Sequence, residues 1–88
     1  MAMQGMDIGE VRQLAQALVA AASELNSMVS TLTKQVQSAH WVGPDRERFV
    51  GDWNSHHASA LKNVAHALDE AGNRAKQDAQ QQEDASNA

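Results

Sequence analysis

Apolar residues recur every seven positions through the first half of the chain. Three adjacent rows with this spacing hold Ile8, Ala15, Ala22, Val29 and Val36; Val11, Leu18, Leu25, Leu32 and Ala39; and Leu14, Ala21 and Met28. This period is that of a helix with a broad apolar face, and its width predicts contact with more than one neighbour. Asp7 and Glu10 match a capping box, so we predict a helix over residues 7–39 that is about 50 Å long.

The second half of the chain repeats the helical pattern. Gly43 is predicted to be the N-cap and Pro44 the first helical residue, where a missing N–H costs nothing. Asp45 and Glu47 then lie near the positive end of the helix dipole. The apolar stripe holds Phe49, Val50, Trp53, His57, Ala60, Leu61, Val64, Ala67, Leu68, Ala71 and Ala75. We therefore predict a second helix over residues 44–78.

A short break between two long helices predicts an antiparallel hairpin. The break is the turn at residues 40–43, and the hairpin occupies residues 7–78. Residues 1–6 are expected to be disordered. Residues 79–88 are rich in Gln, Asp and Glu without periodic apolar positions, so we expect a polar flexible tail.

A hairpin of this kind covers only part of each apolar face. The chain has 88 residues and no cysteine, so disulfides cannot compensate for a small core. We therefore expect two hairpins to form an all-α four-helix bundle that buries on the order of 2,000 Å² or more. The residues expected in the core or dimer seam are Val11, Leu14, Leu18, Leu25, Met28, Leu32, Phe49, Trp53, His57, Leu61, Val64 and Leu68.

Charge and candidate chemistry narrow the possible functions. The formal charge is −4 and the basic residues are scattered, which argues against nucleic acid and against an anionic membrane surface as partners. The four histidines include no helix-spaced pair, so no metal site is expected. The chain has no Cys nucleophile and no Gly-rich phosphate loop, and we expect neither catalysis, a small-molecule substrate nor a cofactor. Its N-terminus does not resemble a cleavable signal peptide.

The residues around the turn carry a family resemblance. Trp41-x-Gly43 is followed by Phe49, six residues after Gly43, and by Trp53 four residues further on. In a short, cysteine-free helical hairpin this arrangement resembles the bacterial WXG family, which includes the early secreted antigenic target. The resemblance covers about residues 7–76. It implies export, as a folded homodimer or a heterodimer with a related hairpin, by a type VII (ESX) secretion system and its ATPase, after synthesis in the cytoplasm.

The chain departs from the family pattern after its second helix. Family members commonly carry Tyr-x-x-x-Asp/Glu there, but this chain has no Tyr. The expected positions fall near Ala75 and Ala79, with Asp78 adjacent. The resemblance therefore implies a role in which the partner supplies the Tyr motif and this chain supplies the Trp-x-Gly turn.

Two alternatives remain open at this stage. Trp41 is either a hydrophobic staple that closes the end of the hairpin or a recognition residue, or both, and Gly43 serves chiefly as a small residue beneath it. The chain as a whole is alternatively a cytosolic helical adaptor or chaperone that masks an amphipathic helix of a larger partner such as a toxin.

Overall fold

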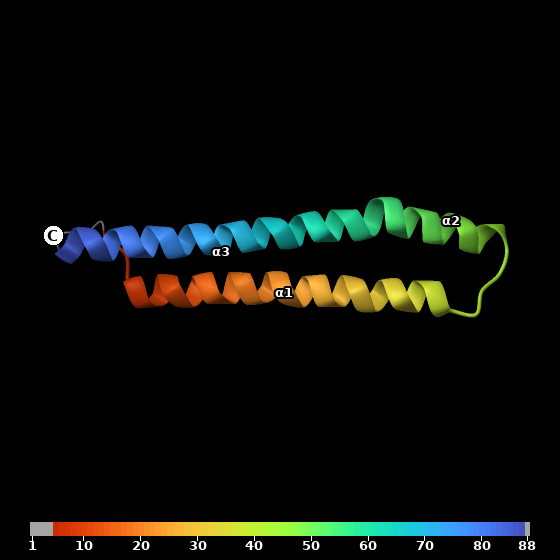
Figure 1. The fold of residues 1–88 in the computed structure, drawn as a ribbon, viewed down its shortest axis with the longest axis horizontal. Helices are drawn as coiled ribbons and strands as arrows, with labels where there is room; N and C mark the ends of the chain where they lie inside the picture. The colour runs from red at the N-terminus through yellow and green to blue at the C-terminus, as the bar shows by residue number, and fades with distance from the viewer. Residues whose placement is uncertain (1–4, 88) are drawn as a thin grey trace.

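The structure is a computed structural model that describes residues 5–87. Two long antiparallel arms joined by a short turn confirm the predicted all-α hairpin (Figure 1). The first arm is helix α1 (Ile8–Ser38). The second arm runs through helix α2 (Pro44–Asp52), a π-helical turn named η1 (Trp53–His57) and helix α3 (Ala58–Asn87). The prediction for residues 1–6 lies mostly outside the described residues.

Local signals fix both ends of α1. The Asp7 carboxylate accepts a hydrogen bond from the Glu10 N–H at 3.0 Å, which caps the helix at the predicted place. The helix ends at Ser38 because Ala39 adopts an extended backbone conformation (φ −62°, ψ 140°). The chain then crosses to the second arm through residues 39–43.

Gly43 begins the second arm, as predicted. Its φ of 120° lies in a region that residues with a side chain rarely adopt. Pro44 follows at the first helical position, and the Gly43 carbonyl accepts the first helical hydrogen bond from the Glu47 N–H at 3.2 Å. The Trp-x-Gly spacing thus has a backbone requirement at its Gly.

The π-helical turn η1 changes the phase of the second arm. The Ala58 N–H donates to the Trp53 carbonyl, five residues earlier, so this turn holds one residue more than an α-helical turn. If the second arm were a regular α-helix, the seven-residue spacing of its buried positions would continue from Ala58 to Gly51, and Gly51 would face α1. Instead Gly51 is exposed and Val50, one position earlier, is half-buried. The extra residue therefore brings Val50 into line with the buried row of α3.

Small residues form the contact between the arms, which we call the seam. Its members are the residues buried in the described part of the chain: Ala15, Ala22 and Val29 of α1 and Ala58, Ala65, Gly72 and Ala79 of α3. On each helix they are seven positions apart. A Cβ atom built on Gly72 would lie 2.9 Å from the Ala15 carbonyl oxygen and 2.7 Å from Val19 Cγ2. Only a residue without a side chain fits at this approach.

The second arm extends further than the sequence predicted. The expected helix end was residue 78, with a flexible tail over 79–88, whereas α3 continues to Asn87. Two contacts explain the difference. Ala79 is completely buried in the seam, and the Arg12 guanidinium donates to Glu83 Oε2 at 2.8 Å and to Gln80 Oε1 at 3.3 Å. The start of α1 thus supports the polar end of α3.

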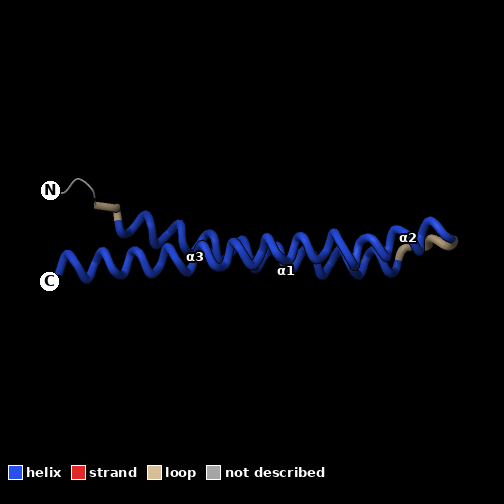
Figure 2. Tube along the Cα trace, turned by 90° about the horizontal axis from the view of Figure 1, so that it is seen from above, coloured by secondary structure: helices blue, strands red, loops and turns tan. Residues whose placement is uncertain are grey.

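The hairpin is a slender rod of 66 × 17 × 16 Å. The two arms lie side by side in Figure 1, and in the perpendicular view they overlap along most of their length and separate toward the end where the termini lie (Figure 2). The radius of gyration is 19.6 Å, whereas a compact domain of this length has one of about 12 Å. The architecture therefore exposes long helix faces instead of enclosing a central core.

Candidate interaction site

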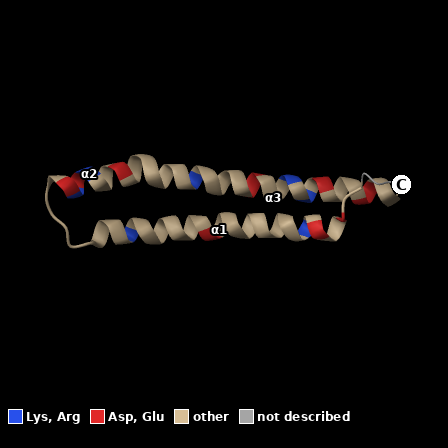
Figure 3. Ribbon diagram, turned by 180° about the vertical axis from the view of Figure 1, so that it is seen from behind, with Lys and Arg blue, Asp and Glu red and all other residues tan. Residues whose placement is uncertain are grey.

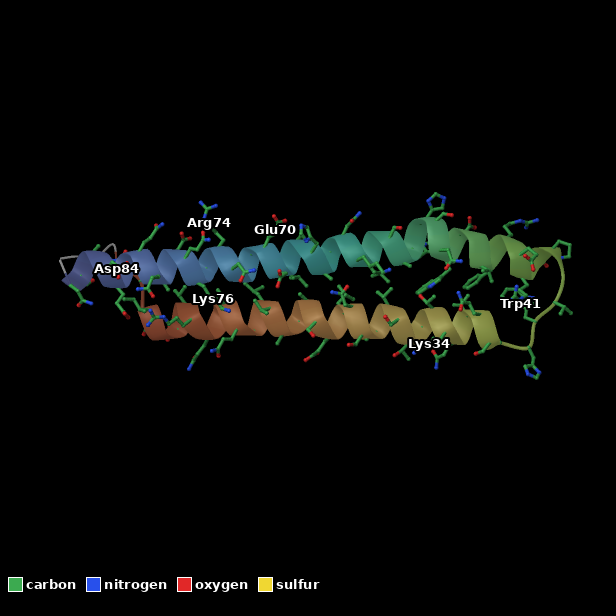
Figure 4. The ribbon with its side chains drawn as sticks, viewed as in Figure 1. Lys34, Trp41, Glu70, Arg74, Lys76 and Asp84 are labelled. Carbon is green, nitrogen blue, oxygen red and sulfur yellow. The ribbon has the colours of Figure 1, made fainter. Side chains whose placement is uncertain are left out.

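The turn end of the hairpin carries an exposed aromatic pair. The ring centroids of Trp41 and Phe49 are 5.5 Å apart and the rings are tilted by 49°. Trp41 is 42% exposed and Phe49 is 44% exposed, while Val42, in the turn that joins the two arms, is 92% exposed. Figure 4 places Trp41 at this end, beside α2. The indole therefore packs as a staple on Phe49 and still presents a large surface to a partner.

Trp53 ties the second arm to α1 just behind this pair. Its indole Nε1 donates to Thr33 Oγ1 at 2.8 Å, and the Thr33 hydroxyl donates to the Val29 carbonyl oxygen at 2.7 Å. Thr33 uses its hydroxyl as donor and acceptor at once. Arg46 adds a second tie by donating to the Gln37 carbonyl oxygen at 3.2 Å. The roles of Thr33 and Arg46 could not be predicted from the sequence, because periodicity shows which face a residue lies on and not which side chains meet across two faces.

The residues predicted for the core or dimer seam are not buried within the hairpin. Val11, Leu18, Leu25, Trp53, Leu61 and Leu68 are half-buried, whereas Leu14, Met28, Leu32, Phe49, His57 and Val64 are exposed. The core part of that prediction is replaced by the small-residue seam. Their place in a dimer seam stays a prediction.

These large residues gather on one long side of the hairpin. On each helix, one row of residues lies three positions after the seam row and another lies six positions after it. Because the two helices are antiparallel, these rows of α1 and α3 lie on the same side of the hairpin. These rows hold Leu18, Leu25, Leu14 and Met28 on α1 and Leu61, Leu68 and Val64 on α3. The hairpin consequently has an apolar side that runs along both arms.

The opposite side carries more polar residues and is concave, with Val19, Ala22 and Ala65 among the residues that line it. It contains an open groove of about 750 Å³ between α1 and α3. Ser23, Asn26 and Ser30 line it from α1, and Lys62 and Asp69 line it from α3. Short side chains on the seam and beside it leave this groove open, so the two long sides of the rod differ in chemistry.

The region that corresponds to the missing export motif lies against α1. Ala79 is 0% exposed and Ala75 is half-buried. Asp78 is half-buried and lies 3.5 Å from the Arg74 guanidinium. A side chain at position 79 therefore faces the seam, and Asp78 is the only one of these three that offers a carboxylate.

Charged groups are distributed unevenly over the two arms. Figure 3 shows few charges on α1 and more on α2 and α3. Among residues 5–87, no three His, Cys, Asp or Glu side chains converge as metal ligands. His66 lies 3.4 Å from Glu70 as a surface pair, and His57 is exposed beside Trp53, with 6.3 Å between the ring centroids. These side chains form local surface pairs, and the features that distinguish this hairpin are its apolar side and its aromatic end.

Two further findings bear on function. None of the helices within residues 5–87 has both the length and the apolar character that crossing a membrane requires. The chain matches no family model, no curated protein and no solved structure.

Proposed function

We propose that this chain is a small non-enzymatic protein that a type VII (ESX) secretion system exports as a folded dimer. The partner is a second copy or a related WXG-type hairpin, and the dimer forms through the apolar side. Trp41 and Gly43 at the turn contribute to the surface that the secretion ATPase recognises, and the partner supplies the Tyr motif that this chain lacks. The chain is made in the cytoplasm and leaves without cleavage of a signal peptide.

The observation that supports the dimer in this proposal is the amount of surface that the hairpin leaves open. The chain exposes 6296 Å², whereas a folded monomer of 9.5 kDa exposes about 5,000 Å², so the excess is roughly 1,300 Å². Each partner in a standard interface buries about 800 Å². The excess is therefore enough for a stable dimer interface, and the exposed Leu14, Met28 and Val64 supply apolar area for it.

The geometry of the turn supports a recognition role for Trp41. The indole packs on Phe49 and remains 42% exposed. Large, partly exposed aromatic side chains with fixed orientation are frequent binding hot spots. Gly43 fixes the turn that presents the ring, because its φ of 120° is disfavoured for other residues.

Export is tested in a bacterial host that has a type VII system. We expect the intact chain in the culture medium when the secretion ATPase is active, and in the cells when the ATPase is inactivated. Trp41→Ala is expected to lower export at least tenfold, while Val42→Ala serves as the control because Val42 is the exposed neighbour of Trp41. Thermal melts of both variants check that the hairpin still folds.

Two results would contradict the export proposal. One is retention in the cells regardless of ATPase activity, and the other is equal export of Trp41→Ala and the wild-type chain. Strict retention would favour the cytosolic adaptor, because the same apolar side also fits an amphipathic helix of a larger protein. Purification of the retained chain with such a protein would then identify that partner.

A further inference from the structure

Helix α1 carries a second apolar row that α3 does not cover. We call it the outer stripe, and its members are Leu14, Ala17, Ala21, Leu25, Met28 and Leu32. They recur at spacings of three and four residues, so they share one side of the helix, about a quarter turn from the seam. Leu14 is 55% exposed, Met28 is 53% exposed and Leu32 is 42% exposed. The stripe is thus an open helix face.

The outer stripe is self-complementary about Ala21. Leu14 lies seven residues before Ala21 and Met28 lies seven residues after it, while Ala17 and Leu25 lie four residues on either side. When two such helices cross antiparallel at Ala21, Leu14 meets Met28 of the second copy and Leu25 meets Ala17 of the second copy. Large residues then lie against small or matching ones, and the Ala21 pair at the centre allows close approach.

The distribution of charge along α1 also favours the outer stripe as the contact face and the antiparallel direction for the pairing. From Leu14 to Leu32 the only charged residue is Glu24, which lies seven residues after Ala17 and so at the edge of the outer stripe that is farther from the seam. Interface cores are depleted of charged residues. A parallel, in-register pairing would bring Glu24 near its own copy, whereas the antiparallel pairing separates the two carboxylates along the helix.

The second arm offers a poorer surface. Within α3, Val64 is the only large apolar residue that is exposed. Glu70 and Arg74 of the same helix point away from α1 into solvent (Figure 4). Figure 3 shows more charged residues along α3 than along α1. The exposed surface of α1 is therefore better suited than that of α3 to an apolar, uncharged contact between helices.

We propose that α1 packs antiparallel on α1 of a second copy of this chain, with Ala21 at the crossing point. The inference rests on the proposed dimer and specifies its central contact. It places the two α1 helices in the middle of the assembly and the two second arms at its flanks.

Single cysteines test this arrangement cleanly because the chain has none. Ala21→Cys is expected to form a covalent dimer under mild oxidation at least tenfold faster than Ala20→Cys, whose exposed side chain points about 100° away around the helix. Leu14→Cys and Met28→Cys are each expected to stay uncrosslinked alone and to crosslink when mixed and refolded together. Circular dichroism of each variant confirms that it is helical.

A second, non-covalent measurement guards against effects of oxidation. In sedimentation equilibrium, the wild-type chain and Ala20→Lys are expected to be dimers, whereas Ala21→Lys is expected to be a monomer. Rapid crosslinking of Leu14→Cys with itself would overturn the antiparallel arrangement. A dimer that forms although Ala21→Cys does not crosslink would overturn the contact and leave the proposed function intact.

Monomer behaviour of the wild-type chain separates the two proposals further. A chain that is monomeric alone at tens of micromolar and dimerises only with a different hairpin would overturn pairing with a second copy, while the export proposal stands. A chain that remains monomeric with every hairpin partner and is not exported would remove both.

Discussion

The two ends of the hairpin are held together in different ways. Away from the turn, Ala and Gly residues of the seam let the helices approach until backbone and side-chain atoms touch at Gly72. At the turn end no residue of α2 or η1 is buried, and the arms are joined by the Trp53–Thr33 and Arg46–Gln37 hydrogen bonds. The comparison shows that close packing of small residues joins the helices away from the turn, whereas side-chain hydrogen bonds join the arms at the turn end.

The π-helical turn lies at the border between the two regions. It adds one residue at η1, so α2 and α3 follow the same seven-residue pattern with a shift of one position. The shift keeps Val50 half-buried and leaves Gly51 facing open space, where a side chain would meet no neighbour within 4 Å of its Cβ. The positions that face α1 in α2 are therefore shifted by one residue relative to those in α3, and this shift separates the aromatic end from the regular helix pair.

The largest expected effect comes from enlarging a seam residue. Ala22 is 3% exposed, so Ala22→Leu must push the helices apart and should lower the free energy of unfolding by about 3 kcal/mol. Ala20→Leu, two residues away on the exposed side, should change it by less than about 0.5 kcal/mol. Chemical denaturation measures both. Equal effects would show that the seam is not closely packed.

Substitution of two glycines by alanine should have opposite signs in the two regions. Both gain about 1 kcal/mol of helix propensity. At Gly72 the new Cβ lies 2.9 Å from a backbone oxygen that cannot move alone, and overpacking costs about 1–3 kcal/mol, so Gly72→Ala should destabilise by about 1 kcal/mol net. At Gly51 the space is open, so Gly51→Ala should stabilise by up to about 1 kcal/mol. Thermal melts in parallel measure both, and a stabilised Gly72→Ala would contradict the close approach.

Removing the indole donor should weaken only the turn end. Trp53→Phe loses the hydrogen bond to Thr33 and should destabilise by about 1 kcal/mol. A double-mutant cycle with Thr33→Val should give a coupling energy of similar size. Hydrogen exchange should rise in residues 44–57 and remain unchanged at the seam. Additive single effects would mean that the two side chains do not act together.

Deleting one residue of the π-helical turn should have the smallest effect. Without Ser55, η1 can close as an α-helical turn while Val50 and Trp53 keep their orientation toward α1, so stability should change by less than about 1 kcal/mol. The control inserts one Ala after Leu68, which rotates Gly72 and Ala79 out of the seam and should be strongly destabilising. Circular dichroism and denaturation follow both variants. A deletion as harmful as the insertion would show that η1 does more than correct the phase.

The sequence predicted the hairpin, the Asp7 cap, and the Gly43–Pro44 start of the second arm, because each depends on residues close together in the chain. It did not predict which apolar row meets the other arm. The rows of Ala15 and of Leu18 are both apolar, and only the smaller one allows the close approach seen at Gly72. It also gave no sign of η1, since one extra residue leaves helical periodicity nearly unchanged on either side.

The prediction for the end of the chain was wrong for a related reason. A polar segment such as residues 79–87 has low intrinsic tendency to order, and only a contact from a distant residue changes that. Arg12 supplies this contact through Glu83 and Gln80. Of the candidate site, Trp41, Gly43 and Phe49 were predicted as a motif, whereas the orientation of the Trp41 ring on Phe49 required the structure.

The narrow cross-section of the hairpin has a mechanical consequence. At 17 × 16 Å across, the folded chain is no wider than two neighbouring helices at any point along its length. In the proposed dimer two such rods lie side by side, so a conduit that admits four helices end-on admits the folded dimer, and passage through it requires alignment of the long axis instead of unfolding.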